Sequence, residues 1–314
     1  MTINCKQLIY GIISFVPGFK GRRPLMTGGT DSAEYCYSVW LRHLVLGFRN
    51  KLCSKVPEVV AEFGPGDSIG IGLAALISGA SRYIGLDVVE HSTLTKNAEI
   101  FDEIIELFKR KAPIPHGPEF DLVKPGLDSY HFPSEILTDA HMAKALSDER
   151  LKHIRKSILS MNRPGSIIQY VVPWTDADPL PSNSVDMIYS QAVMEYCTIL
   201  PEAYHKMREW LKPDGFMSHQ IDFKSHGTFD AWDGHWACSD LKWRLMRGKR
   251  PYFICRSTHS EHIEAIRDAG FKIILDLKSI LPPTIAPGEL NPRYRPLDPQ
   301  DLTIAGAFVQ ARRL

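Results

Sequence analysis

Short apolar runs alternate with stretches of helical periodicity along most of the chain. Seven runs have the length of buried strands, at residues 59–63, 83–89, 167–172, 185–190, 216–221, 271–277 and 302–311. Helices are predicted before the first strand, over residues 31–52, and between the strands, over residues 68–78, 98–111, 202–211 and 258–270, with a more polar helix over residues 139–160. Alternation of this kind is typical of a mainly parallel sheet with helices on both faces. We therefore expect an α/β, doubly wound, Rossmann-like fold with a seven-stranded sheet.

Two long connections interrupt this alternation. Residues 112–160 begin with a proline-rich stretch and are far longer than an ordinary loop, which indicates an insertion that forms a cap or lid. Residues 223–256 are aromatic and basic without a clean period, which indicates a second insertion. The expected organisation is an N-terminal helical cover over residues 1–56 and one main domain over residues 57–314.

Composition excludes several classes of protein. Among 314 residues, 37 Lys and Arg face 36 Asp and Glu, and a net charge of +1 argues against a nucleic-acid partner. The six cysteines form no C-x-x-C pair, which indicates reduced thiols in a cytoplasmic protein. Oligomeric state leaves no signal in the sequence.

The N-terminal segment from Leu8 to Val16 is apolar, with Lys6 before it. A membrane-spanning helix needs about 20 apolar residues, and this run ends at Pro17 far short of that length. We expect no transmembrane segment and interpret the run as an element that covers the core. Peripheral contact with a membrane surface stays open as the alternative.

A glycine-rich turn follows the first predicted strand. Gly64 and Gly66 allow a tight turn and close approach to a ligand, and the helix after them offers free backbone N–H groups. Asp87 ends the next strand about 20 residues further on, where a carboxylate accepts the hydroxyls of a ribose. A strand, turn and helix with this acidic partner predict a nucleoside-binding site.

Two positions favour S-adenosylmethionine over NAD. The third glycine of a dinucleotide turn, which lets the helix approach a pyrophosphate, is replaced by Ile69. Glu62 at the strand end would repel a pyrophosphate and would accept hydrogen bonds from a cationic amino group. Both features suit a zwitterionic cofactor.

Several motifs in order resemble those of class I S-adenosylmethionine-dependent methyltransferases: VVAEFGPGDSIG, YIGLDV, PWTDADPLPSNSVDMIYSQAVMEY and LKPDGF. The resemblance covers residues 57 to the C-terminus, apart from the insertions. It implies the methyltransferase sheet and a cofactor-binding set comprising Glu62, Gly64, Pro65 and Gly66 around the methionine, Asp87 and Val88 at the ribose, Trp174, Asp176 and Ala177 at the adenine, and Ser190 and Gln191 as the floor. This sequence departs from the family at Ser68, usually glycine, and at Tyr196, usually histidine.

Candidate catalytic residues cluster after the fifth strand. His219, Asp222 and His226 can converge on the cofactor pocket, where a histidine oriented by a carboxylate acts as a general base. Glu195 occupies a similar place after the fourth strand. A base is needed when the acceptor is a poor nucleophile such as a hydroxyl. The same residue types could hold a divalent metal, which stays open but is not predicted.

The C-terminal half, including SHQIDFKSHG and STHSEHIEAIRDAGF, also resembles methyltransferases of bacterial surface-polysaccharide biosynthesis. That resemblance implies a hydroxyl on a sugar or glycan precursor as acceptor. Sugars stack on aromatic rings and bond to planar polar groups, and the second insertion supplies such side chains at Trp232, His235, Trp236, Trp243 and Arg247. Packing of these rings onto the sheet is the competing interpretation.

The predicted function is that of an S-adenosylmethionine-dependent methyltransferase acting on a carbohydrate or other small molecule. Three alternatives remain: a methyltransferase with a nitrogen or carbon acceptor, an NAD-dependent oxidoreductase, and a module that binds cofactor without catalysis.

Overall fold

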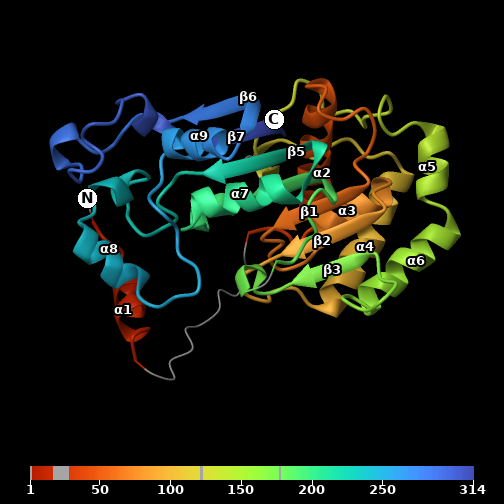
Figure 1. The fold of residues 1–314 in the computed structure, drawn as a ribbon, viewed down its shortest axis with the longest axis horizontal. Coiled ribbons are helices and arrows are strands. Elements are labelled where there is room, and N and C mark those ends of the chain that lie inside the picture. The colour runs from red at the N-terminus through yellow and green to blue at the C-terminus, as the bar shows by residue number, and fades with distance from the viewer. Residues whose placement is uncertain (1, 17–27, 121–122, 177) are drawn as a thin grey trace.

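A single seven-stranded sheet organises the part of the chain described by the computed structural model, residues 2–16, 28–120, 123–176 and 178–314. Its strands are β1 (Val59–Phe63), β2 (Arg82–Leu86), β3 (Ile168–Val171), β4 (Val185–Gln191), β5 (Leu211–Asp222), β6 (Phe271–Ile280) and β7 (Ile304–Arg313). They lie in the order β3-β2-β1-β4-β5-β7-β6 (Figure 1). The first five are parallel, and β7 is antiparallel to both β5 and β6. The predicted doubly wound sheet with a terminal strand pair is confirmed.

The helices are α1 (Cys5–Ile13), α2 (Ala33–Arg49), α3 (Gly70–Ser78), α4 (Leu94–Lys109), α5 (Asp139–Ala145), α6 (Asp148–Leu159), α7 (Leu200–Trp210), α8 (Asp240–Arg247) and α9 (His259–Asp268). The single helix expected over residues 139–160 is two helices. Ser147 in extended conformation separates them, and acidic residues in the next turn favour a new N-terminus. Helix α8 lies in the segment whose sequence shows no helical period.

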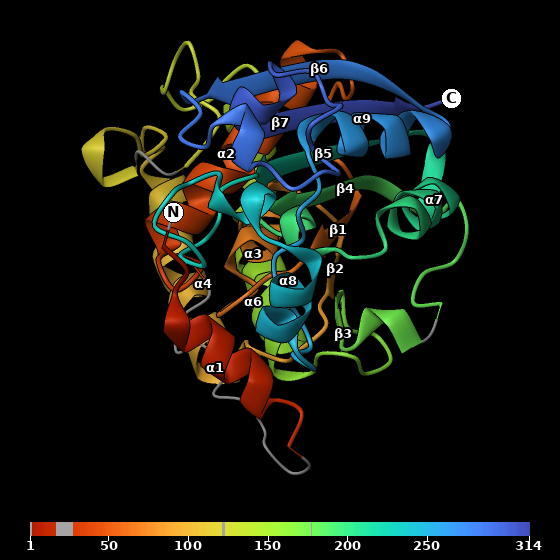
Figure 2. The same ribbon diagram turned by 90° about the vertical axis from the view of Figure 1, so that its left-hand side faces the viewer.

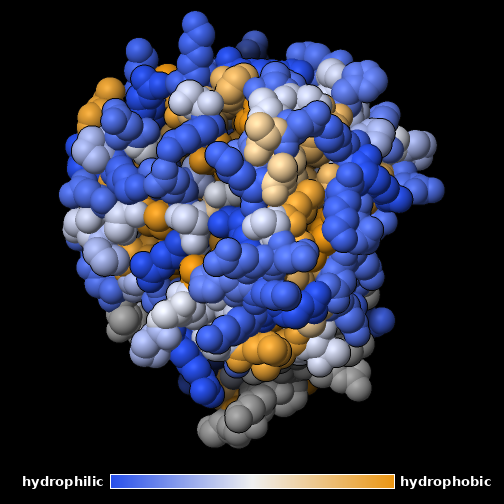
Figure 3. Space-filling model, turned by 90° about the vertical axis from the view of Figure 1, so that its right-hand side faces the viewer, coloured by the Kyte–Doolittle hydropathy of each residue, from blue (hydrophilic) through white to orange (hydrophobic). Residues whose placement is uncertain are grey.

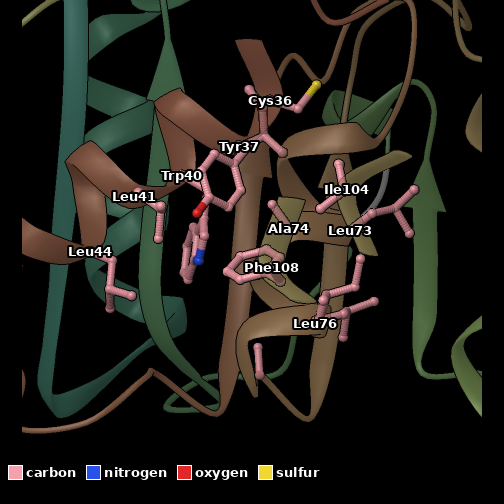
Figure 4. Close-up of a cluster of buried hydrophobic side chains, with 14 of the residues drawn as sticks. Cys36, Tyr37, Trp40, Leu41, Leu44, Leu73, Ala74, Leu76, Ile104 and Phe108 are labelled. Carbon is pink, nitrogen blue, oxygen red and sulfur yellow. The ribbon is translucent and has the colours of Figure 1, made fainter. Parts of the chain in front are cut away.

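Alternate residues of the strands face two separate cores, as the pleat requires. Val60 and Tyr189 belong to the core beneath α2, α3 and α4, part of which is drawn in Figure 4. Their neighbours Ala61 and Ile188 belong to the core beneath α7 and α9. This division decides which side chains at the strand ends can reach one another.

Helix α2 is part of the first core rather than a separate cover. Tyr37 and Trp40 are fully buried. The Trp40 indole donates to Ser78 Oγ at 2.8 Å, and the Tyr37 hydroxyl donates to the carbonyl of Ala112 at 2.7 Å. The expected boundary near residue 56 therefore lies within one continuous core.

Helix α1 instead packs on α8, and the two helices lie at the left of the sheet in Figure 1 and in front of it in Figure 2. A Cβ at Gly11 would lie 2.1 Å from the carbonyl oxygen of Leu245, so only glycine permits this contact. Asn4 N–H donates to the carbonyl of Thr228 at 2.9 Å. Within the described ranges, no helix is both long enough and apolar enough to cross a membrane.

Most of the first insertion joins the helical layer beside the sheet. Helix α6 packs on α4 and β3. Arg150 donates to the carbonyl of Leu76 at 2.8 Å, and His141 Nε2 lies 2.7 Å from the carbonyl of Ser78. Of the described residues between 112 and 160, only Glu119, Phe120, Val123 and Lys124 border the cavity described below, so the lid expected over this segment stays a prediction for that short part.

Candidate functional site

A cavity of about 1180 Å³ opens at the carboxyl ends of the central strands. It lies where the strand order reverses between β1 and β4, the place at which open parallel sheets bind ligands. Its walls come from the ends of β1, β2, β4 and β5 and from segments far apart in sequence, including Thr30, Tyr35, Gly64, Pro65, Gly66, Asp87, Val88, His91, Phe120, Gln191, Val193, Tyr196, Gln220, Asp222, Lys224, His226 and Tyr252.

The glycine turn forms one wall. Gly64 and Gly66 have φ angles of +64° and +78°, a left-handed backbone that glycine adopts without strain. The Gly64 N–H donates to the carbonyl of Leu86 at 2.8 Å, which holds the turn against β2. A Cβ at Gly64 would lie 2.6 Å from Val193 Cγ2, so the turn leaves no room for a side chain. A bound group can therefore approach the backbone closely.

Asp87 lies beside this turn, buried at the end of β2. Its Oδ1 accepts hydrogen bonds from the N–H groups of Val88 at 2.7 Å and Val89 at 3.4 Å, which fix the carboxylate toward the cavity. Burial raises its pKa, and these amides oppose that rise. The turn and the carboxylate share one cavity, an arrangement that fits a ribose and its attached groups.

Glu62 lies behind the turn rather than in the cavity wall. Its Oε2 accepts hydrogen bonds from the hydroxyls of Tyr83 at 2.6 Å and Tyr189 at 3.1 Å. Burial raises its pKa to about 8. Glu62 shares a pleat face with Val60 and points beneath α2–α4, so the expected direct contact with a cationic amine is not what the structure provides.

The two predicted floor residues separate by the same alternation. Gln191 lines the cavity, and its Oε1 lies 3.3 Å from His43 Nε2. His43 in turn bonds Ser218 Oγ through Nδ1 at 2.7 Å, and burial lowers the pKa of this histidine to about 3. A neutral histidine on α2 therefore positions Gln191. Ser190 faces the opposite core and is fully buried.

His219 is not part of the cavity. It is fully buried and its Nδ1 lies 2.8 Å from Ser190 Oγ, while its ring lies near Tyr204 of α7. Burial lowers its pKa to about 3. It shares a pleat face with Ile221, whereas Gln220 on the other face reaches the cavity. The predicted convergence of three residues therefore holds for Asp222 and His226 alone.

Asp222, His226 and Tyr196 line the cavity, and Glu195 lies buried behind them. His226 Nε2 lies 3.7 Å from Asp222 Oδ2 and 3.8 Å from Glu195 Oε1. His226 Nδ1 lies 3.1 Å from the Tyr196 hydroxyl. We call these four residues the His226 cluster. Tyr196, at the position where class I methyltransferases usually have a histidine, thus contacts His226 from another segment of the chain.

Electrostatics in the His226 cluster favour a neutral imidazole. Burial lowers the pKa of His226, and Asp222 opposes that shift. Burial raises the pKa of Glu195 well above its ordinary value, and the Asp222 carboxylate adds to the effect. Within the described residues, neither Glu195 oxygen has a hydrogen-bond partner. Lys224 Nζ lies 3.1 Å from Asp222 Oδ2.

Trp174 of the predicted adenine set packs in the second core. Its ring lies 5.0 Å from Phe63 and 6.2 Å from Trp210, and it does not line the cavity. The side chain of Asp176 and the whole of Ala177 lie outside the described residues.

The aromatic side chains of the second insertion pack the insertion together. Trp236 and His235 are buried, and Trp236 Nε1 donates to the carbonyl of Arg256 at 3.2 Å. Trp243 is buried beneath the Arg256 guanidinium, and Trp232 donates to a backbone carbonyl. Arg247 is exposed on α8. None of them borders the cavity, so the expected sugar-stacking platform is wrong and the packing interpretation holds.

The structure adds cavity residues that the sequence analysis did not select. Thr30 and Tyr35 come from the start of α2, while His91 and Tyr252 face each other with ring centres 5.9 Å apart. Phe120 follows the proline-rich stretch. Of these residues, only Tyr252 lies in a segment that the sequence places beside the acceptor, namely the second predicted insertion.

Among the residues that the structure describes, no group of three or more His, Cys, Asp or Glu side chains is arranged so that it could hold a metal ion.

Comparison with known proteins indicates which class of enzyme domain this chain is similar to. Residues 141–218 match the family model described as "Methyltransferase domain". No curated protein matches the sequence significantly. Solved structures of similar fold include an S-adenosylmethionine-dependent methyltransferase from Mesorhizobium loti, with 14% identity, coverage of 91% of this chain and 100% of that one, and a TM-score of 0.41. Another is the trans-methyltransferase CalH in complex with SAH, with 13% identity, coverage of 89% and 58%, and a TM-score of 0.38.

Structural similarity with identities and TM-scores this low does not support a conclusion about function. Residues 141–218 are thus similar to a methyltransferase domain, and the strand order is that of a Rossmann-like sheet with a terminal antiparallel strand pair.

Proposed function

We propose that the protein transfers a methyl group to a hydroxyl oxygen of a small acceptor, with His226 as the general base. The observation that carries this proposal is the position of the His226 cluster, which borders the same cavity as the Gly64 turn and Asp87. Asp87 would hold the ribose, and the Gly64 turn would face the methionine part of the cofactor. Bound S-adenosylmethionine supplies an electrophilic methyl group.

Methyl transfer is an in-line displacement in which the acceptor oxygen forms a bond to carbon while the carbon–sulfur bond breaks. The electron pair of that bond stays on sulfur, and the hydroxyl proton passes to the base. His226 can accept it at Nε2 when Nδ1 carries a proton and donates it to the Tyr196 oxygen at 3.1 Å. Asp222 near Nε2 then stabilises the imidazolium that forms.

The helix after the glycine turn argues against the rival dinucleotide site. Pyrophosphates bind to free N–H groups at a helix N-terminus. Here the Ile69 N–H donates to Asn97 Oδ1 at 3.0 Å, and the Gly70 N–H donates to Ser68 Oγ at 3.0 Å. The Ser68 N–H is directed at Thr30 Oγ1. Because side chains already bind these amides, we infer a thioether-type nucleoside rather than NAD.

A sugar or glycan precursor is the finer form of the proposal. The resemblance to polysaccharide-pathway methyltransferases supports it, and the cavity offers polar groups at Gln220, Lys224 and Ser279 beside the rings of Tyr196 and Tyr252. Aromatic faces and polar groups together suit a sugar ring.

The test is incubation of the protein and S-adenosylmethionine with a panel of free sugars, nucleotide-linked sugars, other hydroxylated metabolites and amines. Product S-adenosylhomocysteine and the methylated acceptor are measured by mass spectrometry. We expect an O-methylated product, with a rate that rises with pH through a pKa below the ordinary histidine value of about 6.5 and is then constant. Methylation of amines alone, or a rate independent of pH in that range, would contradict the proposal.

A further inference from the structure

Helices α1 and α8 expose an unusual number of apolar side chains. We call residues 2–16 and 239–250 the α1–α8 arm. In α1 only Gly11 is buried, although nearly the whole helix is apolar. Ile9 is 53% exposed and Ile12 is 47% exposed, and their spacing places them on one face. Figure 1 shows the arm at the left of the sheet, and these exposed fractions show that the face has no partner within the described chain.

The exposed apolar residues continue beyond the helix. Phe15 is 47% exposed and Val16 is 57% exposed, while Leu241 at the start of α8 is 68% exposed. The opposite side of the molecule is mainly hydrophilic, although a band of orange residues also lies on it (Figure 3). Apolar side chains gathered on one surface mark an interaction site, whereas single ones are ordinary.

Positive charge accompanies this apolar surface. The arm contains six Lys and Arg residues and a single acidic residue, Asp240, which pairs with Arg256, whereas the whole chain is nearly neutral. Exposed cations lie along α8 and just after it, at Lys242, Arg244, Arg247 and Lys249, and none forms an ion pair with a carboxylate in the described ranges. Lys249 Nζ lies 5.9 Å from the ring centre of Phe15, so charge and apolar surface are directly adjacent.

From this combination we infer that the α1–α8 arm docks on a membrane surface that carries anionic lipids. Apolar side chains insert at the boundary between headgroups and acyl chains, and unpaired cations beside them attract anionic headgroups. An apolar protein partner would not require the excess of cations. Tyr252, two residues beyond the arm, lines the cavity, so docking would bring one cavity wall close to the lipid.

The experiment is flotation of the purified full-length protein with phosphatidylcholine vesicles, with and without phosphatidylglycerol. We expect binding to the anionic vesicles that weakens as salt increases, because salt screens the lipid charge. Ile9→Ser with Ile12→Ser, and separately Lys242→Glu with Lys249→Glu, should each lower the bound-to-free ratio by roughly ten-fold or more. Thermal melting and S-adenosylhomocysteine binding establish that each variant is folded.

Matched controls lie on α6. Leu159 is 66% exposed and Lys156 is exposed, so Leu159→Ser and Lys156→Glu make the same chemical changes elsewhere on the surface. Both should bind vesicles as the unchanged protein does. Failure of the folded protein to bind anionic vesicles, or equal losses in the controls, would overturn the inference. So would a self-association that the isoleucine changes abolish without any vesicle binding, since a second copy would then cover the arm.

Discussion

The two halves of the cavity are built in different ways. The proposed cofactor half, at the ends of β1 and β2, consists mainly of backbone: a turn that excludes side chains at Gly64 and a carboxylate fixed by two neighbouring amides at Asp87. The proposed acceptor half, at the ends of β4 and β5, consists of side chains from separate segments that meet at His226. Local geometry defines the first half, and tertiary packing defines the second.

Replacing the proposed base is the strongest way to separate these halves. His226→Gln should lower kcat by about 10²- to 10⁴-fold, the usual contribution of a general base, while S-adenosylhomocysteine affinity stays within about two-fold. His205, exposed on α7, provides the control His205→Gln, which should change neither quantity. Initial rates and calorimetry measure the two effects. A parallel loss of cofactor affinity would show that the two halves are not independent.

Adding a side chain at the glycine turn should instead weaken the binding of the cofactor product. Gly64→Ala places a Cβ 2.6 Å from Val193 at a left-handed φ, so we expect S-adenosylhomocysteine to bind roughly 100-fold more weakly. Gly165→Ala is the matched control, because Gly165 also has a positive φ but has open space around its Cβ position. That control should lose some thermal stability and no affinity. Unchanged affinity in Gly64→Ala would remove the turn from the cofactor site.

Substitution of Glu62 tests whether a residue that packs behind the glycine turn affects the stability of the protein without affecting cofactor binding. Its pKa is about 8 in the folded protein against 4.5 as the ordinary value, so its contribution to stability is fully present below pH 4.5 and is lost as pH rises to 8. Between pH 6 and pH 8 this loss amounts to roughly 2–3 kcal/mol. Denaturant titrations of Glu62→Gln should lack that decline, with little change in cofactor affinity. A pH dependence equal to that of the unchanged protein would contradict the assignment.

The smallest expected effect concerns the tyrosine that orients the base. Tyr196→Phe removes the hydroxyl 3.1 Å from His226 Nδ1, and we expect kcat to fall by roughly 3- to 10-fold because one neutral hydrogen bond is lost. The pH profile should also shift, since the tautomer of His226 is no longer fixed. Tyr10→Phe, at an exposed position on α1, is the control. An unshifted profile would limit Tyr196 to packing.

The sequence could predict what depends on local pattern. The strands were recognisable from apolar runs, and the turn and Asp87 from their order and spacing. Pleat alternation could also have separated His219 from Gln220, because Met217 and Ile221 indicate which face of β5 lies beneath α7.

The remainder depends on contacts between distant segments. Nothing near Tyr35 in the sequence indicates that it lines the same cavity as Tyr252, because its position follows from the packing of α2. The tryptophans of the second insertion have a composition that suits sugar binding, yet burial of their rings stabilises the insertion itself. Composition cannot distinguish these uses.

The most direct test of the account is calorimetric titration of S-adenosylhomocysteine into the protein and into Asp87→Ala. Loss of hydrogen bonds to a charged group predicts binding roughly 10- to 100-fold weaker in the variant, whereas Asp214→Ala, at the exposed start of β5, should bind normally. NADH should not bind either folded protein. Equal affinity in Asp87→Ala and the unchanged protein would contradict the placement of the cofactor at the ends of β1 and β2.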